Sequence, residues 1–208
     1  MKIYELESSG DERWIWFYAV EGAVVLPNPS EAMAFFQSQP RIRIDRNTEK
    51  SPCGSSAVLP DLSNVGSGTK PCLSERAKAV LGPRIDSLGQ WLPLECDEAP
   101  YWLFNVTQTV DALDESESQL IRFDDGRVMR IAQFTFLPEK LRGELLFKVP
   151  QGPGHPNLVT QDFVDIVHEH GLTGFSFRLL WSEENGPVSS KLKDWERPRF
   201  TGLEPRTA

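Results

Sequence analysis

The chain has 208 residues, 39% of them hydrophobic, and a formal net charge of −8 at neutral pH. Its 12 Phe and 6 Trp side chains can form a sizeable core, which excludes a disordered protein. The acidic balance argues against a nucleic-acid partner, because phosphate binding requires a basic surface. It is compatible with a basic protein partner, although many proteins are acidic for solubility alone.

The N-terminal part of the sequence predicts a small α/β subdomain followed by a linker. Residues 1–7 alternate apolar and polar side chains, and residues 13–20 are aromatic and β-prone, so both segments predict strands. Residues 31–37 predict a short helix. We therefore expect a strand–strand–helix subdomain over residues 1–45. Residues 46–72, rich in Ser, Gly and Pro, predict a loop or linker.

The central part of the sequence predicts one helix and a hairpin between apolar strands. The helix begins after the N-cap Ser74 and is expected to end at Gly82-Pro83. The apolar segments 90–94 and 101–106 predict strands, the second of them buried on both faces. The pair Asp125-Gly126 lies between two strand-like segments and supplies the positive φ angles of a tight hairpin turn.

The C-terminal part predicts two strands and the clearest helix of the chain. Residues 145–149 predict a strand, and residues 150–157 a Pro- and Gly-rich surface loop. The helix over residues 162–170 is expected to end at Gly171, which can adopt the left-handed conformation of a helix terminus. Residues 174–181 then predict the last strand of the sheet.

Short strands outnumber helices and do not alternate regularly with them. This order predicts the α+β class, with a mostly antiparallel sheet, a few short helices packed on it and the small N-terminal α/β subdomain. The main α+β domain is expected over residues 73–182, and a C-terminal extension over residues 183–208.

The cysteines and the apolar segments bear on the compartment. Cys53, Cys72 and Cys96 are odd in number, and their spacing fits neither a disulfide framework nor a metal site. We expect three free thiols, as in a reducing compartment. The sequence shows no signal-peptide pattern and no apolar run of about 18 residues. These features predict a cytoplasmic protein that does not enter a membrane.

The residue types that carry out catalysis do not form a recognisable grouping. His168 and His170 are two positions apart on a predicted helix, so they point to different faces and cannot jointly hold a metal. His155 has no fixed partner in the sequence, and no cysteine lies in a nucleophile motif. We therefore expect a protein that is not an enzyme and uses no metal or cofactor.

The charge is unevenly distributed along the chain. Residues 85–121 contain eight acids and no Lys or Arg. Within this window, the segment Asp111–Glu117 has three interpretations: a solvated turn or short helix, a recognition patch for a basic partner, or a metal or catalytic site without the EF-hand pattern. As candidate partner-binding residues we take seven acids: Asp111, Asp114, Glu115, Glu117, Glu95, Asp97 and Glu98.

Five motifs in a fixed order resemble a known family. They are LSERAKAVL at 73–81, YWLFNVT at 101–107, VDALD at 110–114, FDDGRVMRI at 123–131 and GLTGFSFRLLW at 171–181. Together, over about residues 58–182, they resemble the myxobacterial-type immunity protein family, formerly a domain of unknown function. The resemblance implies a cytoplasmic antitoxin that binds and neutralises a cognate secreted polymorphic toxin, and it implies no particular binding residues.

Two other functions stay open on the sequence alone. One is a small-molecule-binding or enzymatic α+β domain with an aromatic pocket built from Trp91, Tyr101, Trp102 and Trp181, although core packing is the simpler explanation of these residues. The other is a homo-oligomeric scaffold that pairs through an exposed sheet edge.

Overall fold

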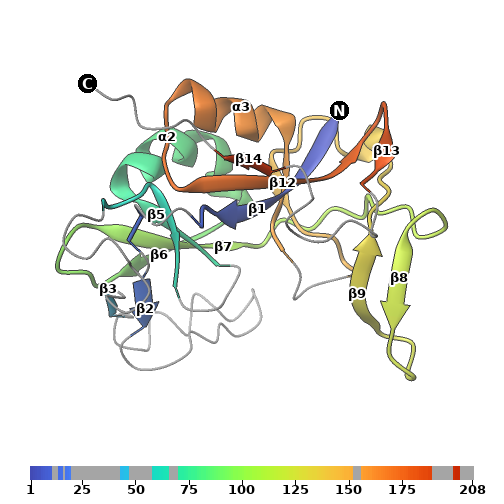
Figure 1. Ribbon diagram of the computed structural model, residues 1–208, viewed down its shortest axis with the longest axis horizontal. Coiled ribbons are helices and arrows are strands. Elements are labelled where there is room, and N and C mark those ends of the chain that lie inside the picture. The colour runs from blue at the N-terminus through green and yellow to red at the C-terminus, as the bar shows by residue number, and fades with distance from the viewer. Residues whose placement is uncertain are drawn as a thin grey trace. The chain divides into compact units, whose positions relative to one another are not determined.

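A computed structural model gives the fold of the α+β class, with mostly antiparallel sheets and short helices, as the sequence predicts (Figure 1). The structure describes residues 1–10, 14–15, 17–19, 43–46, 58–65, 70–151, 156–188 and 199–201. The helix predicted over residues 31–37 lies outside these ranges, as do Cys53 and His155.

The chain forms two compact units, each assembled from separate stretches of sequence. Unit 1 comprises Met1–Leu6, Gln108–Ile166 and Phe177–Phe200. Unit 2 comprises Glu7–Thr107, Val167–Ser176 and Thr201–Ala208. The predicted division at residues 45, 72 and 182 stays a prediction.

The largest sheet has most of its residues in unit 1. Its strand order is β10-β11-β1-β12-β13, and β14 also pairs with β12. The pairs β1–β11, β10–β11 and β12–β13 are antiparallel. The strands are β1 (Lys2–Ser8), β10 (Leu146–Phe147), β11 (Leu158–Thr160), β12 (Phe175–Ser182), β13 (Gly186–Pro187) and β14 (Arg199–Thr201).

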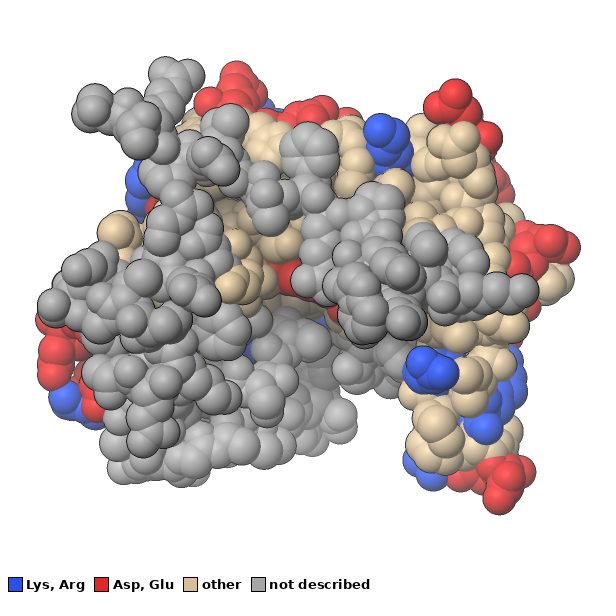
Figure 2. Space-filling model, in the orientation of Figure 1, with Lys and Arg blue, Asp and Glu red and all other residues tan. Residues whose placement is uncertain are grey.

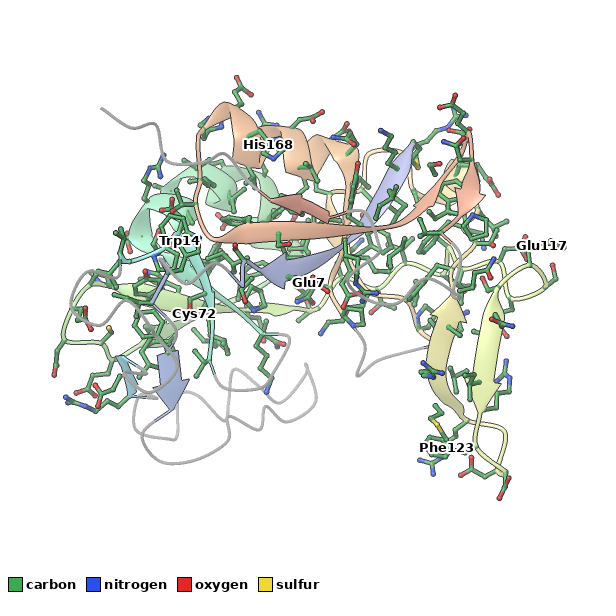
Figure 3. All side chains as sticks on the ribbon, viewed as in Figure 1. Glu7, Trp14, Cys72, Glu117, Phe123 and His168 are labelled. Atoms are coloured by element: carbon green, nitrogen blue, oxygen red, sulfur yellow. The ribbon has the colours of Figure 1, made fainter. Side chains whose placement is uncertain are left out.

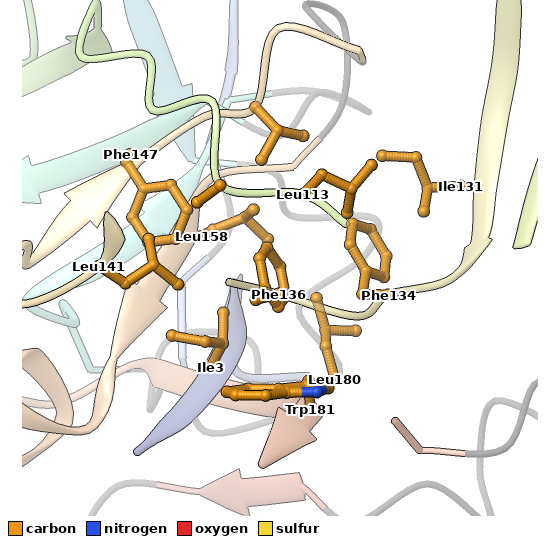
Figure 4. Packing of buried hydrophobic residues seen from close by; sticks show 12 residues of the cluster. Ile3, Leu113, Ile131, Phe134, Phe136, Leu141, Phe147, Leu158, Leu180 and Trp181 are labelled. Carbon is orange, nitrogen blue, oxygen red and sulfur yellow. The ribbon is translucent and has the colours of Figure 1, made fainter. Parts of the chain in front are cut away.

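Aromatic and aliphatic side chains together fill the core of unit 1 (Figure 4). Phe136 lies at its centre and makes edge-to-face contacts with Phe147 and Trp181, at ring-centroid distances of 6.4 and 5.9 Å. Such pairs stabilise a core by about 0.5–1.5 kcal/mol beyond the burial of area. Beside this core, the neighbouring strands β1 and β12 carry a largely buried ion pair between Glu5 and Arg178.

Unit 1 also contains the predicted hairpin. Strands β8 (Gln119–Arg122) and β9 (Val128–Gln133) pair antiparallel around the Asp125-Gly126 turn, and Gly126 has a φ of 85°. Leu120, Val128 and Ile131 pack against the core of unit 1. The 3-10 turn η3 (Pro138–Lys140) follows β9. Local turn chemistry therefore identified the hairpin correctly.

Helix α3 (Gln161–Glu169) ends as its sequence predicts. Gly171 has a φ of 58°, and the amide of Leu172 donates to the carbonyl of Val167 at 3.0 Å. This bond satisfies a carbonyl that the helix end leaves without a partner.

The main sheet of unit 2 has four strands in the order β4-β5-β7-β6, and all three pairs are antiparallel. A small pair, β2 with β3, contributes Phe17 and Ile44 to the same core as Tyr101 and Leu103. The strands are β2 (Phe17–Ala19), β3 (Ile44–Arg46), β4 (Leu62–Asn64), β5 (Pro71–Ser74), β6 (Gly89–Leu94) and β7 (Tyr101–Val106).

Helix α2 (Glu75–Ile85) follows β5 directly, and the 3-10 turn η2 (Asp86–Leu88) follows the helix. The predicted end at Gly82-Pro83 is wrong, because the helix continues to Ile85. Pro83 lacks only one N–H near the end of the helix, and continuation buries Ile85 beside Leu81.

A buried carboxylate joins three segments of unit 2. Asp61, at the start of β4, accepts hydrogen bonds from Ser74 Oγ at 2.7 Å and from Thr173 N at 2.9 Å. Arg76 Nη1 lies 2.6 Å from the same carboxylate, and its Nη2 donates to the carbonyl of His170 at 2.6 Å. Ser74 Oγ also accepts from Ala77 N and thereby caps helix α2.

Asp61→Ala is expected to lower the free energy of unfolding by about 2–4 kcal/mol, because it leaves several buried donors without an acceptor. Chemical denaturation followed by circular dichroism measures the loss. The matched control is Asp124→Ala on the exposed hairpin turn, which should change stability by less than about 0.5 kcal/mol. Equal losses in both variants would show that the Asp61 contacts do not support the fold.

Candidate partner-binding surface

The acidic segment of unit 1 is held in place by the apolar residues inside it. Ala112 and Leu113 are buried in the core, whereas Asp111, Glu115 and Glu117 are exposed. Backbone bonds fix the segment, including Leu137 N to the carbonyl of Ala112 at 2.9 Å. The sequence pattern therefore directs the small and branched apolar side chains inward and three carboxylates outward.

Asp114 has a role inside the turn. Its Oδ1 accepts hydrogen bonds from Ser116 Oγ at 2.7 Å, Ser116 N at 3.0 Å and Glu117 N at 3.3 Å. The bond from the Ser116 hydroxyl and those from the two amides lower the pKa of the Asp114 carboxyl. Asp114 therefore shapes the turn that presents its acidic neighbours. The sequence alone does not separate it from the other candidate partner-binding acids.

The exposed acids of this turn differ in their partners. Gln151 Nε2 donates to Asp111 Oδ1 at 3.1 Å and to Glu115 Oε1 at 3.0 Å, so one amide bridges two carboxylates. Glu115 also pairs with Arg122 of β8 at 2.8 Å. Within the described part of the chain, no side chain pairs with the carboxylate of Glu117, which projects outward in Figure 3. Glu117 is thus the acid most available to a partner.

The acids of unit 2 form a separate group after β6. Glu95, Asp97 and Glu98 are exposed. Arg43 Nη1 lies 3.3 Å from Glu95 Oε1, and Arg43 Nη2 lies 2.5 Å from Asp97 Oδ2. Asp97, followed by Asp45 and Glu95, raises the pKa of the Arg43 guanidinium. Sequence reasoning missed Arg43, because it lies outside residues 85–121, the window without Lys or Arg. An isolated β-bridge between Arg43 and Glu95 places it beside these acids. The group is therefore partly neutralised.

Comparison with known proteins identifies the family. Residues 18–180 match the model of the immunity protein family Imm11, which is most of the chain. The chain belongs to this family. No curated protein matches it. The immunity protein family predicted from five short motifs is thus confirmed, and the match begins further toward the N-terminus than those motifs do.

The four aromatic residues of the alternative pocket have different surroundings in this Imm11 chain. Tyr101 is buried in unit 2, where its hydroxyl donates to the carbonyl of Pro60 at 2.5 Å, and burial raises its pKa. Trp181 belongs to the core of unit 1. Trp91 and Trp102 are half-buried in unit 2, and Lys78 Nζ lies 3.0 Å from the Trp102 ring centroid. Two of the four therefore serve core packing, as the simpler interpretation holds.

The described residues contain no group of three or more His, Cys, Asp or Glu side chains that could hold a metal ion. His168 lies on α3 and His170 just beyond it. In the same parts of the chain, no helix is long and apolar enough to span a membrane.

Cys72 and Cys96 are free thiols, and Cys53 lies outside the described residues. Burial, and then the nearby Cys96, raises the pKa of the Cys72 thiol well above its ordinary value. Only the thiolate reacts with alkylating reagents. Cys72 is therefore protected from alkylation both because reagents cannot reach it and because its thiol stays protonated. Cys96 is partly exposed.

Alkylation of the native protein near pH 8 should modify Cys96 at least about tenfold faster than Cys72. Unfolding without reductant should remove the difference and release all three thiols, Cys53 included. Mass spectrometry of the labelled peptides measures both results. Equal native rates would contradict the burial of Cys72, and a single titratable thiol in the unfolded chain would indicate a disulfide.

Asp114→Asn is expected to destabilise the protein at neutral pH, because an amide oxygen accepts the three bonds of the turn more weakly than a carboxylate. The pKa of Asp114 is lowered in the folded state, so the carboxylate stabilises the protein above the unfolded-state pKa. That contribution is lost as the pH falls through the folded-state pKa. Melting temperatures of both proteins from pH 7 to pH 2 should therefore converge in acid. A constant difference would contradict this role.

Proposed function

We propose that this Imm11 protein is an antitoxin that binds a cognate secreted toxin in the cytoplasm and neutralises it by occupying the toxin surface. The match to the immunity protein family over residues 18–180 carries this proposal. In this proposal the protein acts by binding the toxin and catalyses no reaction. The proposal needs no cofactor.

The exposed carboxylates supply a means of recognition. A toxin that acts on nucleic acid requires a basic cleft, since its substrate is a polyanion. Carboxylates presented to that cleft attract it over a distance of about 10 Å at 0.1 M salt and exclude the substrate by charge. Asp111, Glu115 and Glu117 are the candidate acids of unit 1 that face solvent, and they lie on a turn anchored by Ala112 and Leu113.

Among the seven candidate acids, we give this turn the main role. Asp114 holds its shape from within. Glu95 and Asp97 both pair with Arg43 at 3.3 and 2.5 Å. In the turn, Glu115 pairs with Arg122 and Asp111 lies 3.9 Å from Lys140, but among the described residues no cation pairs with Glu117, which gives the turn the more available carboxylate. The three candidate acids of unit 2 stay candidates for a second, weaker contact.

The function is tested with the toxin domain that the proposal expects in the neighbouring gene, produced with and without the full-length protein. Cells that make both proteins should grow, and the purified proteins should form a stable complex. Growth arrest despite equal expression, together with no complex, would reject the antitoxin function. An enzyme that consumes the toxin's product would instead restore growth without a complex.

Asp111→Asn, Glu115→Gln and Glu117→Gln in one variant should slow association with this toxin on the order of three- to tenfold at low salt, because steering depends on net charge. The difference should shrink as salt is added. The matched control removes the same number of charges from unit 2, by Glu95→Gln, Asp97→Asn and Glu98→Gln. Surface plasmon resonance measures the rates.

A slower rate in the control variant alone would move the contact to unit 2. Unchanged rates in both variants would show that acids do not guide recognition. The amide replacements keep side-chain size and leave Asp114 intact, so the fold should not confound the result.

A further inference from the structure

One face of the hairpin β8–β9 packs against the core of unit 1, and the other face does not. Leu120, Val128 and Ile131 pack against the core of unit 1. Strand alternation places Ile121 on the opposite face of β8, where Arg130 is its cross-strand partner. Phe123 follows the end of β8 at Arg122 and belongs to the tip of the hairpin. The outer face and the tip therefore contribute little to the core.

The tip exposes large apolar side chains. Phe123 and Met129 are each 46% exposed, and they account for two of the four large hydrophobic residues that the described ranges leave exposed. Met129 is the extra residue of a β-bulge between the pairs Ile121–Arg130 and Arg122–Val128. Phe123 lies at the far end of the hairpin, away from Glu117 at its base (Figure 3).

The tip is also ordered before any partner arrives. The amide of Phe123 donates to the carbonyl of Arg127 at 2.9 Å, and Arg127 N donates to Asp125 Oδ1 at 3.0 Å. The Arg127 guanidinium lies 5.6 Å from the Phe123 ring centroid. Arg122 Nη1 donates to the carbonyl of Gly126 at 2.9 Å. A side chain held in this way loses less conformational entropy on binding.

The charge of the hairpin is opposite to that of the chain. Residues 119–133 carry three arginines and two aspartates, whereas the chain as a whole has a net charge of −8. Figure 2 shows Lys or Arg side chains along the hairpin, with acids at its end. Arg122 is paired with Glu115 and Arg127 with Asp125, and among the described residues no acid pairs with Arg130. Arg130 is thus available to a carboxylate of a partner.

We propose that the tip and outer face of this hairpin, formed by Phe123, Met129 and Arg130, are the apolar anchor that the toxin binds. This proposal rests on the proposed function and assigns the anchor to a particular element. The complementary surface on the toxin is an apolar recess with a carboxylate at its rim. Aromatic, Met and Arg side chains are the types enriched at the centres of protein interfaces.

The hairpin and the acidic turn have different kinetic roles. Exposed charges act mainly on the association rate, whereas desolvated apolar anchors act mainly on the dissociation rate. The turn at Asp111–Glu117 would guide the encounter, and Phe123 would then hold the complex together. Glu115 and Arg122 join the two elements through their ion pair.

The test measures dissociation of the adjacent-gene toxin domain from the full-length protein. Phe123→Ser and Met129→Ser should each speed dissociation about tenfold or more and change association little. Val58→Ser is the matched control, since Val58 is 56% exposed and lies in unit 2. It should leave both rates unchanged. Arg130→Ser should give a smaller effect, lost at high salt.

The outcomes separate this proposal from the antitoxin function. Binding of the wild-type protein with unchanged dissociation in the Phe123 and Met129 variants would overturn the hairpin anchor and leave the function intact. No binding of the wild-type protein would reject both. Amide hydrogen exchange, measured on the wild-type protein with and without toxin, tests the anchor without any variant that could misfold. Residues 122–130 should exchange more slowly when the toxin is bound, and unchanged exchange there would also overturn the anchor.

Discussion

The buried carboxylate of Asp61 ties together segments of unit 2 that are far apart in the sequence. It accepts from Ser74 at the start of α2 and from Thr173, which is 112 residues away from it. The amide of Leu62 donates to the carbonyl of Thr173 at 3.0 Å, so backbone and side chain reinforce the same junction. Gly174 completes it, because a Cβ at that position would lie 2.2 Å from the carbonyl oxygen of Leu62. The start of β4, the cap of α2 and the segment after α3 therefore depend on one another.

Sequence reasoning succeeded where local chemistry decides the structure. The Asp125-Gly126 turn and the end of α3 at Gly171 follow from backbone preferences that neighbouring residues set. It failed at the end of α2, where tertiary burial of Ile85 outweighs the local cost of Pro83. The junction between Asp61 and Thr173 could not be predicted, because two hydrogen-bond partners 112 positions apart leave no local pattern.

The candidate site shows the same division between local and distant contacts. The exposure of Asp111, Glu115 and Glu117 follows from the buried Ala112 and Leu113 between them, which the sequence displays. The internal role of Asp114 depends on the particular geometry of its turn. The neutralisation of Glu95 and Asp97 by Arg43 depends on a bridge between distant segments, so a count of charges along the chain overstated the acidity of that region.

The β8–β9 hairpin packs on the core with one face only, and this has a consequence for engineering. Because Leu120, Val128 and Ile131 fix the ribbon from one side, the positions on its other side can be randomised as a library without changing the core composition. The closed turn at Gly126 limits how far such a library can vary the backbone, so diversity would come from side-chain chemistry alone. The scaffold could then be selected to recognise new targets in the manner of a small binding protein with a single grafted loop.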